Sequence, residues 1–542
     1  MTASDVHPLV QQGRAAANAG DFRAAIGLAE TRLTQAPQDL NALELLALAQ
    51  SGCGQSEAAI ATLRRVLALD PACAWAHADL ALELHRRGDA TGAEMATRQG
   101  LTAQPDSADL AQMLGVLLSE REDLPGGERS FRRALALAGP HPQVLRNLAS
   151  NLLRQGRLDE AEPLFAQAHA SAPRDSILLA HWARLHEARG DFGRAHALLD
   201  QAERAGGDVG LQRAVTFARQ GDLNAALRLL QGELGGDALL ERGRILERLG
   251  RYDEAWADYE AGKSKLGARL GARYDAAAVS ARFAALKAAF APGRTSARAE
   301  TRSDCAQPIF VLGFPRSGTT MIEQMLSCHS GVRAGGELPF LAELEPRLPE
   351  MASAEGVAAL RDHYLARAAD YGLKDGRFFT DKMPLNDVWL PLIRAMFPRA
   401  PVLRVRRHPL DVCVSMLSHH LTHGDNCGYR LADIAAHIAA VDDLTAYYES
   451  LEPGFVCEVR YERFVAAQEE ETRRALAALG LDFEAQCLRF HENPRHAPTP
   501  SYAQVTEPLN DRSIGRWTRF RKQLEPVLPI LAPIASRLGY AV

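Results

Sequence analysis

The sequence predicts two architectures in one chain, an α-solenoid over residues 1–290 followed by an α/β domain over 306–542. A glycine and an alanine recur about every 34 residues in the N-terminal half, which is rich in Ala, Leu, Arg and Glu and has few strand signals. The C-terminal half instead alternates short apolar runs with helical stretches, the pattern of a parallel sheet with helices on both faces. Residues 291–305 are polar and turn-forming, so we expect them to form a linker.

Seven glycines mark the N-terminal repeat: Gly20, Gly54, Gly88, Gly156, Gly190, Gly221 and Gly250. The first steps equal 34 residues or twice that length, and the last two steps are 31 and 29. An alanine follows each glycine by five residues, at Ala25, Ala59, Ala93, Ala161, Ala195, Ala226 and Ala255. We therefore expect about eight units, each a helix, a glycine turn and a second helix that crosses its neighbour closely at the alanine.

This pattern resembles the tetratricopeptide repeat (TPR), a helix pair of about 34 residues. The resemblance implies a TPR superhelix with a concave groove, which we expect to hold a peptide or a partner protein. A spacer and an arm for homodimerisation are the alternatives left open. We interpret the charges of the array, such as Arg86-Arg87 and Arg132-Arg133, as solvated helix faces, and we expect the α/β domain to fold apart from the array.

The α/β domain begins with a strand, a tight loop and a helix. The apolar run Ile309–Leu312 ends at Gly313, and a helix starts after Gly318. Such a loop presents free backbone N–H groups and a helix dipole to an anion. The glycine spacing is that of a P-loop, but Thr319 stands where enzymes that cleave ATP or GTP have Lys. Because Arg316 is the cation of this loop, we expect a phosphate-like ligand that is not a magnesium-bound triphosphate.

Three further strands are predicted: Arg377–Asp381, Val402–Arg406 and Phe455–Arg460. Each ends in polar residues, at the edge where parallel sheets bind ligands. After the strand Val402–Arg406, Arg407 precedes a predicted helix, Leu410–Leu421, and Ser415 lies about two turns into it. Both side chains are therefore placed to reach one phosphate.

These two segments resemble the phosphate motifs of sulfotransferases that use 3′-phosphoadenosine-5′-phosphosulfate (PAPS). Among these enzymes the chain is most similar to tyrosylprotein sulfotransferases, over roughly 306–540. The resemblance implies that Arg407 and Ser415 bind the 3′-phosphate. It places the 5′-phosphosulfate on the loop residues Pro315, Arg316, Ser317, Gly318, Thr319 and Thr320. The other shared segments are Gly336-Glu337, Lys382-x-Pro384, Val459–Glu462 and Leu538–Tyr540.

The resemblance also implies catalytic roles. Glu337 matches the base that removes the proton of the acceptor hydroxyl, and Arg316 and Lys382 match groups that stabilise the transferring sulfuryl group. Tyr461 matches a residue that contacts the cofactor. A Ser-Lys-Trp segment that stabilises the leaving group is matched only loosely, by Ser513 and a tryptophan four residues later. Arg516 and Lys522 are further candidates to bind the cofactor from this segment.

A histidine cluster departs from the tyrosylprotein enzymes, which carry another cofactor arginine at the position of His419. We interpret His419, His420 and His423 as residues on the rim of the cleft. No Cys or carboxylate at ligand spacing supports a zinc site, although Asp425 and Cys427 lie close. We therefore expect no metal.

The predicted function is sulfuryl transfer from PAPS to a hydroxyl acceptor, releasing adenosine 3′,5′-bisphosphate. Peptide tyrosine, glycan and small-molecule acceptors all stay open. The alternative is a TPR interaction scaffold with a catalytically degenerate nucleotide-binding domain. A P-loop kinase would need the missing loop Lys and a strand-end Asp.

Composition limits the partners and the compartment. The net charge of −5 argues against general nucleic-acid binding. Eight scattered Cys without a CxxC pair indicate reduced thiols. Neither a signal peptide nor an apolar run of about 18 residues is evident, so we expect a cytoplasmic protein that does not enter the membrane.

Overall fold

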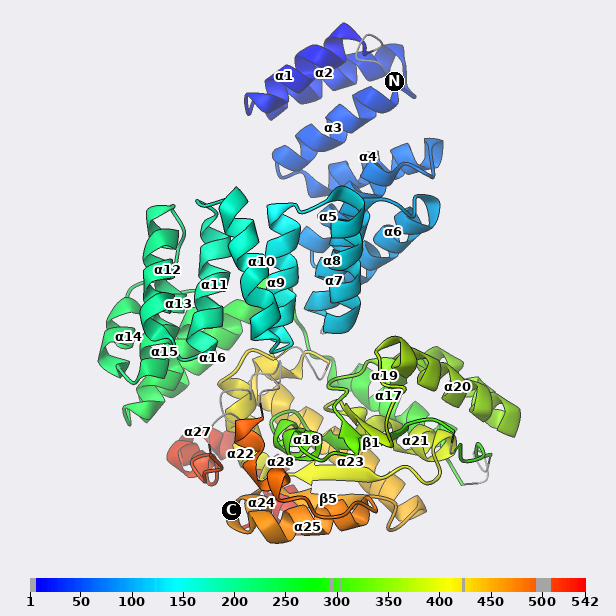
Figure 1. Cartoon of the computed structure of the whole chain (residues 1–542), viewed down its shortest axis with the longest axis vertical. Helices are drawn as coiled ribbons and strands as arrows, with labels where there is room; N and C mark the ends of the chain where they lie inside the picture. Colours follow the sequence, from blue (N-terminus) through cyan, green and yellow to red (C-terminus); the bar gives the residue numbers. More distant parts are fainter. Residues whose placement is uncertain (1–5, 122, 293–296, 303, 422–424, 494–507) are drawn as a thin grey trace. The chain divides into compact units, whose positions relative to one another are not determined.

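The computed structural model describes residues 6–121, 123–292, 297–302, 304–421, 425–493 and 508–542. The chain divides into two compact units. The first contains Met1–Leu153 with Leu158–Pro173, and the second contains Arg154–Arg157 with Arg174–Val542. The division therefore falls inside the helical array, ahead of the α/β domain (Figure 1).

The helices of the first unit are arranged in pairs. They are α1 (Pro8–Asn18), α2 (Phe22–Gln35), α3 (Leu40–Gly52), α4 (Ser56–Leu69), α5 (Ala74–Arg86), α6 (Ala90–Ala103), α7 (Ala108–Glu120), α8 (Leu124–Ala138), α9 (Pro142–Arg154) and α10 (Leu158–Ser171). The second unit continues the array. Its helices are α11 (Ser176–Ala188), α12 (Phe192–Arg204), α13 (Gly210–Gln220), α14 (Leu223–Leu229), α15 (Gly236–Arg248) and α16 (Tyr252–Leu270).

The repeat signals of the sequence have direct structural causes. All seven repeat glycines have φ between 72° and 100°, a backbone conformation that residues with a Cβ rarely adopt. All seven repeat alanines are fully buried, because the second helix of each pair packs closely at that position. The described residues contain sixteen array helices in eight pairs, which confirms the predicted number of units.

The α/β domain follows α17 (Ala276–Ala289) and is built on a parallel sheet of five strands with the order β2-β3-β1-β4-β5. The strands are β1 (Gln307–Gly313), β2 (Val332–Arg333), β3 (Phe378–Lys382), β4 (Val402–Arg406) and β5 (Cys457–Arg460). The predicted parallel sheet is confirmed, with four strands where the sequence places them. The two-residue β2 is too short to show a periodicity.

Helices cover both faces of the sheet, as predicted. Phe310 and Leu312 of β1 pack into a core with α17, α20 (Ala354–Asp370), α21 (Leu390–Met396) and α23 (Leu431–Leu451). Ile309 and Val311 point to the other face, toward α18 (Thr319–Ser327), α24 (Tyr461–Ala466) and α25 (Gln468–Ala478). The remaining α-helices are α19 (Phe340–Glu343), α22 (Pro409–Leu417), α27 (Arg521–Leu524) and α28 (Leu528–Arg537).

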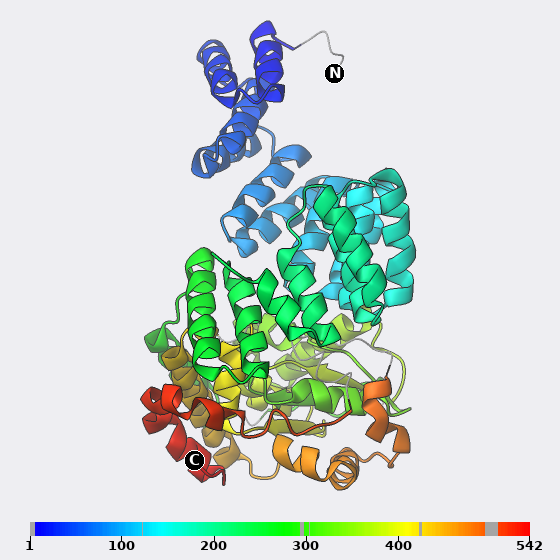
Figure 2. The ribbon, with the colours of Figure 1, turned by 90° about the vertical axis from the view of Figure 1, so that its left-hand side faces the viewer.

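The last array pair shares a hydrophobic core with the α/β domain. Trp256 and Tyr259 of α16 lie against Phe520, with ring centroids 5.4 and 6.4 Å apart. The same core includes residues of α15, α22 and α28, and Figures 1 and 2 show α15 and α16 next to the C-terminal helices. This shared core changes the expectation that the α/β domain folds apart from the array. None of the helices within the described residues has the length and apolar character needed to cross a bilayer.

Candidate functional site

The loop between β1 and α18 has the geometry of an anion site. Gly313 and Gly318 have φ of 146° and 108°, and Arg316 between them has φ of 70°. A Cβ at Gly318 would lie 2.7 Å from a ring carbon of Tyr461, so the close approach of this ring requires glycine. Among the described residues, no side chain caps the N-terminus of α18. The positive end of the α18 dipole therefore faces the loop, where it favours a bound oxyanion.

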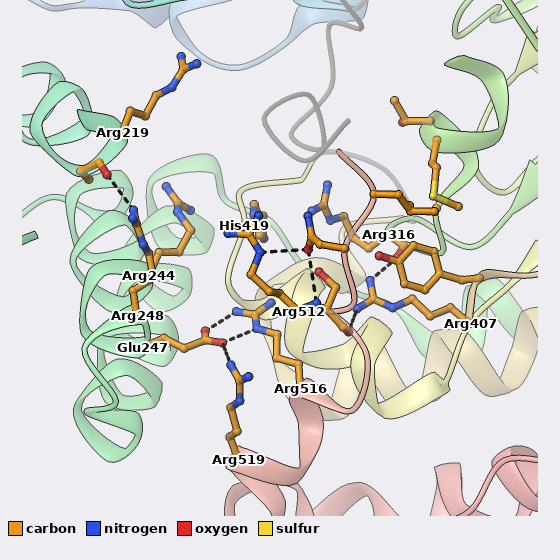
Figure 3. A pocket seen from close by; sticks show the side chains of 18 of the residues that line it. Arg219, Arg244, Glu247, Arg248, Arg316, Arg407, His419, Arg512, Arg516 and Arg519 are labelled. Carbon is orange, nitrogen blue, oxygen red and sulfur yellow. Dashed lines mark hydrogen bonds and ion pairs between the residues drawn. The ribbon is translucent and has the colours of Figure 1, made fainter. Parts of the chain in front are cut away.

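The loop borders a pocket of about 900 Å³ (Figure 3). From the α/β domain, Arg316, Gly318, Thr320, Arg407, His419 and Tyr461 contribute to its wall. The C-terminal segment adds Arg512, Ser513, Arg516 and Arg519, and the array adds Arg219, Arg244, Glu247 and Arg248. Among the lining residues that the structure describes, eight arginines therefore face a single carboxylate. Such an excess of positive charge suits a polyanionic ligand.

Arg316 lies at the centre of this charge. Its side chain is buried, and its Nε donates a hydrogen bond to Ser415 Oγ at 3.0 Å. Burial lowers the pKa of Arg316 to about 9, and the charges of Arg407, Arg516 and Arg244 contribute to the shift. The four guanidinium groups are thus close enough to repel one another, and a bound oxyanion would relieve that repulsion.

Arg407 joins the loop to the C-terminal segment. Its Nη1 donates to the carbonyl oxygen of Arg316 at 3.0 Å, and its Nη2 donates to that of Ser513. The guanidinium lies over the ring of Tyr461, 4.8 Å from the centroid. Arg407 and Ser415 therefore both contact Arg316. Arg407 donates to the backbone carbonyl oxygen of Arg316, and Ser415 accepts a hydrogen bond from the Arg316 side chain.

Not every predicted loop residue lines the pocket. Pro315, Ser317 and Thr319 are buried beneath it. Ser317 borders a separate cavity of about 70 Å³, where its Oγ has no hydrogen-bond partner among the described residues. Gly318 and Thr320 are the loop residues that line the pocket besides Arg316.

Glu337 and Lys382 form an ion pair. Lys382 ends β3, where it lies opposite Val311 of β1, and its Nζ donates to Glu337 Oε1. The Lys382 side chain is 1% exposed and that of Glu337 is 14% exposed. The ammonium group of Lys382 favours the ionised form of the Glu337 carboxylate, which is the form that can accept a proton.

The turn that carries Glu337 is held by α18. Glu323 of α18 accepts hydrogen bonds from the backbone N–H of Gly336 and from Thr380 Oγ1, both at 2.8 Å. At Gly335 a Cβ would lie 2.1 Å from the carbonyl oxygen of Thr380, and Gly336 has φ of 78°. Neither glycine tolerates a side chain, so the two place Glu337 beside Lys382. This pair does not line the 900 Å³ pocket.

The C-terminal segment is anchored by Asp411 of α22, whose carboxylate accepts hydrogen bonds from the backbone N–H groups of Gly515 and Trp517, both at 2.8 Å. Ser513 reaches the pocket wall next to Arg407. Arg516 also lines the pocket, but it forms an ion pair with Glu247 of α15. Lys522 is exposed on α27 and does not line the pocket, so its predicted role finds no support there.

The histidine cluster is only partly described. His419 follows α22, which ends at Leu417 rather than at the predicted Leu421. Its Nδ1 lies 2.9 Å from the carbonyl oxygen of Ser415 and therefore donates to it. Burial and the charges of Arg316, Arg244 and Arg516 lower the pKa of His419 well below its ordinary value. His420 contacts Asp237 of α15 at 3.2 Å, and His423 lies outside the described residues.

The described part of the chain contains no group of three or more His, Cys, Asp or Glu side chains arranged to hold a metal ion.

Sequence reasoning missed the contribution of the array to the pocket. Arg244, Glu247 and Arg248 are three and four residues apart, so they lie on one face of α15. That spacing is common on solvated helices. Only the packing of α15 and α16 on the α/β domain shows that these side chains line the pocket. Arg86 and Arg132, by contrast, are about half exposed, as the sequence predicts.

Comparison with known proteins supports the motif assignments. Residues 308–485 match the sulfotransferase family, and residues 40–73 and 152–216 match the tetratricopeptide repeat. A putative protein-tyrosine sulfotransferase of Caenorhabditis briggsae is 28% identical over 259 residues, which cover 44% of this chain and 90% of the relative. The protein-tyrosine sulfotransferase 1 of Danio rerio is 26% identical over 258 residues, covering 43% and 72%.

Other similar proteins are less informative. An uncharacterized Aquifex aeolicus protein is 32% identical over 245 residues, which cover 42% of this chain. The match spans only about a third, 32%, of the length of that protein. A solved TPR protein of Thermus thermophilus is 27% identical, with a TM-score of 0.29, over 33% of this chain and 96% of that one. Taken with the parallel sheet and the helical repeats, the matches assign residues 308–485 to the sulfotransferase family, in a chain that joins TPR repeats to a domain similar to protein-tyrosine sulfotransferases.

Proposed function

We propose that this chain transfers a sulfuryl group from PAPS to a hydroxyl acceptor and releases adenosine 3′,5′-bisphosphate. The observation that carries the proposal is the arginine-lined pocket at the N-terminus of α18. A nucleotide with two phosphate-bearing ends carries several negative charges, and the described residues of the pocket supply eight arginines against one carboxylate. The pocket volume of about 900 Å³ also suits a ligand of nucleotide size.

The residues of the chain divide the work of binding. The N–H groups of the first turn of α18 and the Arg316 guanidinium would hold the phosphosulfate end, because they converge at the loop. Arg407 is fixed by two carbonyl oxygens and by Tyr461, which leaves it pre-organised for a second phosphate. When bound, PAPS supplies a sulfuryl group whose transfer leaves negative charge on the nucleotide phosphate.

The residues near β3 would serve the acceptor. Glu337 would remove the proton of the attacking hydroxyl, and Lys382 would hold the carboxylate ionised until the acceptor arrives. Arg316 would stabilise the charge that develops during transfer, since its guanidinium sits in the loop itself. The acceptor is proposed to be a hydroxyl of a peptide or protein held by the repeats, and the names of the relatives favour tyrosine.

The test uses radiolabelled PAPS with a proteome extract, comparing the wild-type protein with Arg316→Ala. We expect a labelled acceptor with the wild type and a loss of at least a hundredfold in labelling with the variant. Equal labelling by both proteins would contradict the role of the loop. Binding of adenosine 3′,5′-bisphosphate without any labelled acceptor would favour the alternative of an interaction scaffold.

A further inference from the structure

One wall of the arginine-lined pocket belongs to the repeat array. Arg219 comes from α13, and Arg244 and Arg248 come from α15, one helical turn apart. Figure 3 shows these three residues, hereafter the array arginines, across the pocket from Arg316 and Arg407. All five line the same pocket within the second compact unit.

Arg244 and Arg248 keep donors available for a ligand, whereas Arg219 forms an ion pair with Glu187. A guanidinium carries five N–H donors. Arg244 uses three of them, two on Glu241 and one on the carbonyl oxygen of Ser418 at 2.9 Å. Arg248 donates to the carbonyl oxygen of Ala218 at 2.8 Å and has no carboxylate within 4.0 Å among the described residues.

Among the described residues, Arg244 is the array arginine with a hydrogen bond to the α/β domain. Its contact with Ser418 places it at the C-terminal end of α22, the helix that carries Ser415. Its charge acts on Arg316 and on His419, which both line the pocket. An anion bound beside Arg316 would therefore be attracted by the charge of Arg244.

We propose that Arg244, supported by Arg248, binds a phosphate oxyanion of the nucleotide, so that the repeat array forms part of the donor site. This inference rests on the proposed function, because it takes the nucleotide to be the ligand of the pocket. The repeats then have a role beyond holding a partner: their last helix pair completes the pocket in which the donor is bound. Removal or displacement of that pair would weaken donor binding even with every residue of the α/β domain intact.

The competing explanation is that Arg244 only links α15 to α22. A link of that kind would contribute to folding stability and would affect all ligands of the pocket equally. A residue that contacts one phosphate would instead affect only ligands that carry that phosphate. The two explanations are therefore separable by ligands that differ in a single phosphate.

The experiment is calorimetric titration of the full-length protein with adenosine 3′,5′-bisphosphate, adenosine 3′-phosphate and adenosine 5′-phosphate. The variants are Arg244→Ala and Arg248→Ala, with Arg251→Ala as the control. Arg251 belongs to the same helix pair but pairs with Glu254 on the surface and does not line the pocket. Thermal unfolding without ligand checks that each variant is folded.

We expect Arg244→Ala to weaken the bisphosphate by about ten- to a hundredfold, as for a lost charge-assisted hydrogen bond. The affinity for one of the two monophosphates should fall by a similar factor, and the affinity for the other should change little. Arg248→Ala should show a smaller loss, and Arg251→Ala none. Equal losses for all three ligands, or no loss with Arg244→Ala, would overturn the inference.

Two further outcomes separate this inference from the proposed function. Wild-type protein that binds none of the three nucleotides would overturn both. If the wild type binds the bisphosphate, Arg316→Ala abolishes this binding and Arg244→Ala does not weaken it, only the role of the array is overturned. If Arg244→Ala does not fold, Arg244→Lys and Arg248→Ala carry the test, because Arg248 is exposed and makes a single hydrogen bond to the part of the chain that the structure describes.

Discussion

Glu247 of the repeat array and Arg516 of the C-terminal segment form an ion pair in which both side chains are about nine-tenths buried. Arg516 Nε donates to Glu247 Oε1 at 2.6 Å, and its Nη2 donates to Oε2. The hydroxyl of Tyr259 also donates to Oε2, at 2.7 Å. The pair joins segments 269 residues apart, and the arginine-lined pocket therefore depends on the array for the position of one of its arginines.

Removal of the Glu247 carboxylate should destabilise the protein. Glu247→Ala leaves the buried guanidinium of Arg516 without its carboxylate, which typically costs about 3–5 kcal/mol. The free energy of unfolding from denaturant titration measures this loss. Glu254→Ala is the control, because Glu254 pairs with Arg251 on the surface of the same helix pair. A loss no greater than that of the control would show that the pair contributes little to stability.

The same pair should make stability depend on pH. Although burial opposes it, the hydrogen bond and charge of Arg516 hold the pKa of Glu247 below its ordinary value of 4.5. A carboxyl group with a lowered pKa contributes stability above its unfolded pKa and loses it as the pH falls through the folded pKa. The stability difference between the wild type and Glu247→Gln should therefore be constant from neutral pH down to about pH 5 and should shrink below about pH 4.5. A difference that does not change between pH 7 and pH 3 would contradict this.

Truncation should show that the last repeats belong to the folding unit of the α/β domain. Residues 174–542 keep α15 and α16 and should unfold cooperatively. Residues 300–542 lose the aromatic partners of Phe520, which is fully buried, and each such ring buries roughly 150–250 Å². We expect the shorter fragment to be insoluble or to lack a cooperative thermal transition. Equal melting temperatures for the two fragments would contradict the shared core.

The loop predicts a preference among nucleotides. Thr319 occupies the position of the Lys that binds the β- and γ-phosphates in triphosphate sites. Adenosine 3′,5′-bisphosphate should therefore bind much more tightly than ATP with Mg²⁺. Calorimetric titration of both ligands under the same salt conditions measures the preference, and equal affinities would contradict it.

The sequence contains enough information for the architecture because the repeat signals are local. A turn glycine needs a positive φ, and an alanine at a close crossing needs a small volume, so Gly54 and Ala59 mark their elements by themselves. The sequence predicts that α22 continues to Leu421, beyond its actual end at Leu417, because no residue between these two breaks the helical pattern. The two-residue β2 carries no pattern at all.

Only part of the candidate site can be predicted from the sequence, for a different physical reason. Arg316, Arg407 and Ser415 lie in motifs set by the strand ends, so sequence reasoning finds them. Arg244 and Glu247 reach the pocket only because α15 and α16 bury apolar residues against the α/β domain. That packing joins segments far apart in the chain, and a single sequence shows the apolar residues without showing what they pack against.

Glu337 is the catalytic assignment that a substitution can test most directly. Its carboxylate pairs with Lys382, and its turn is fixed by Glu323 of α18. Glu337→Gln keeps the size of the side chain and its hydrogen bonding to Lys382 but removes the group that accepts a proton. The rate of transfer should fall by about 10²–10⁴-fold, the usual contribution of a general base, measured with saturating PAPS on a verified acceptor.

Nucleotide affinity provides the contrast that makes this result specific. Glu337 does not line the donor pocket, so Glu337→Gln should bind adenosine 3′,5′-bisphosphate like the wild type. Arg407→Ala should do the reverse and weaken the nucleotide mainly through its 3′-phosphate. A Glu337→Gln protein that turns over at nearly the wild-type rate would exclude this residue as the base. His419 would then be the first alternative, because its Nδ1 donates to the carbonyl oxygen of Ser415, which leaves Nε2 able to accept a proton.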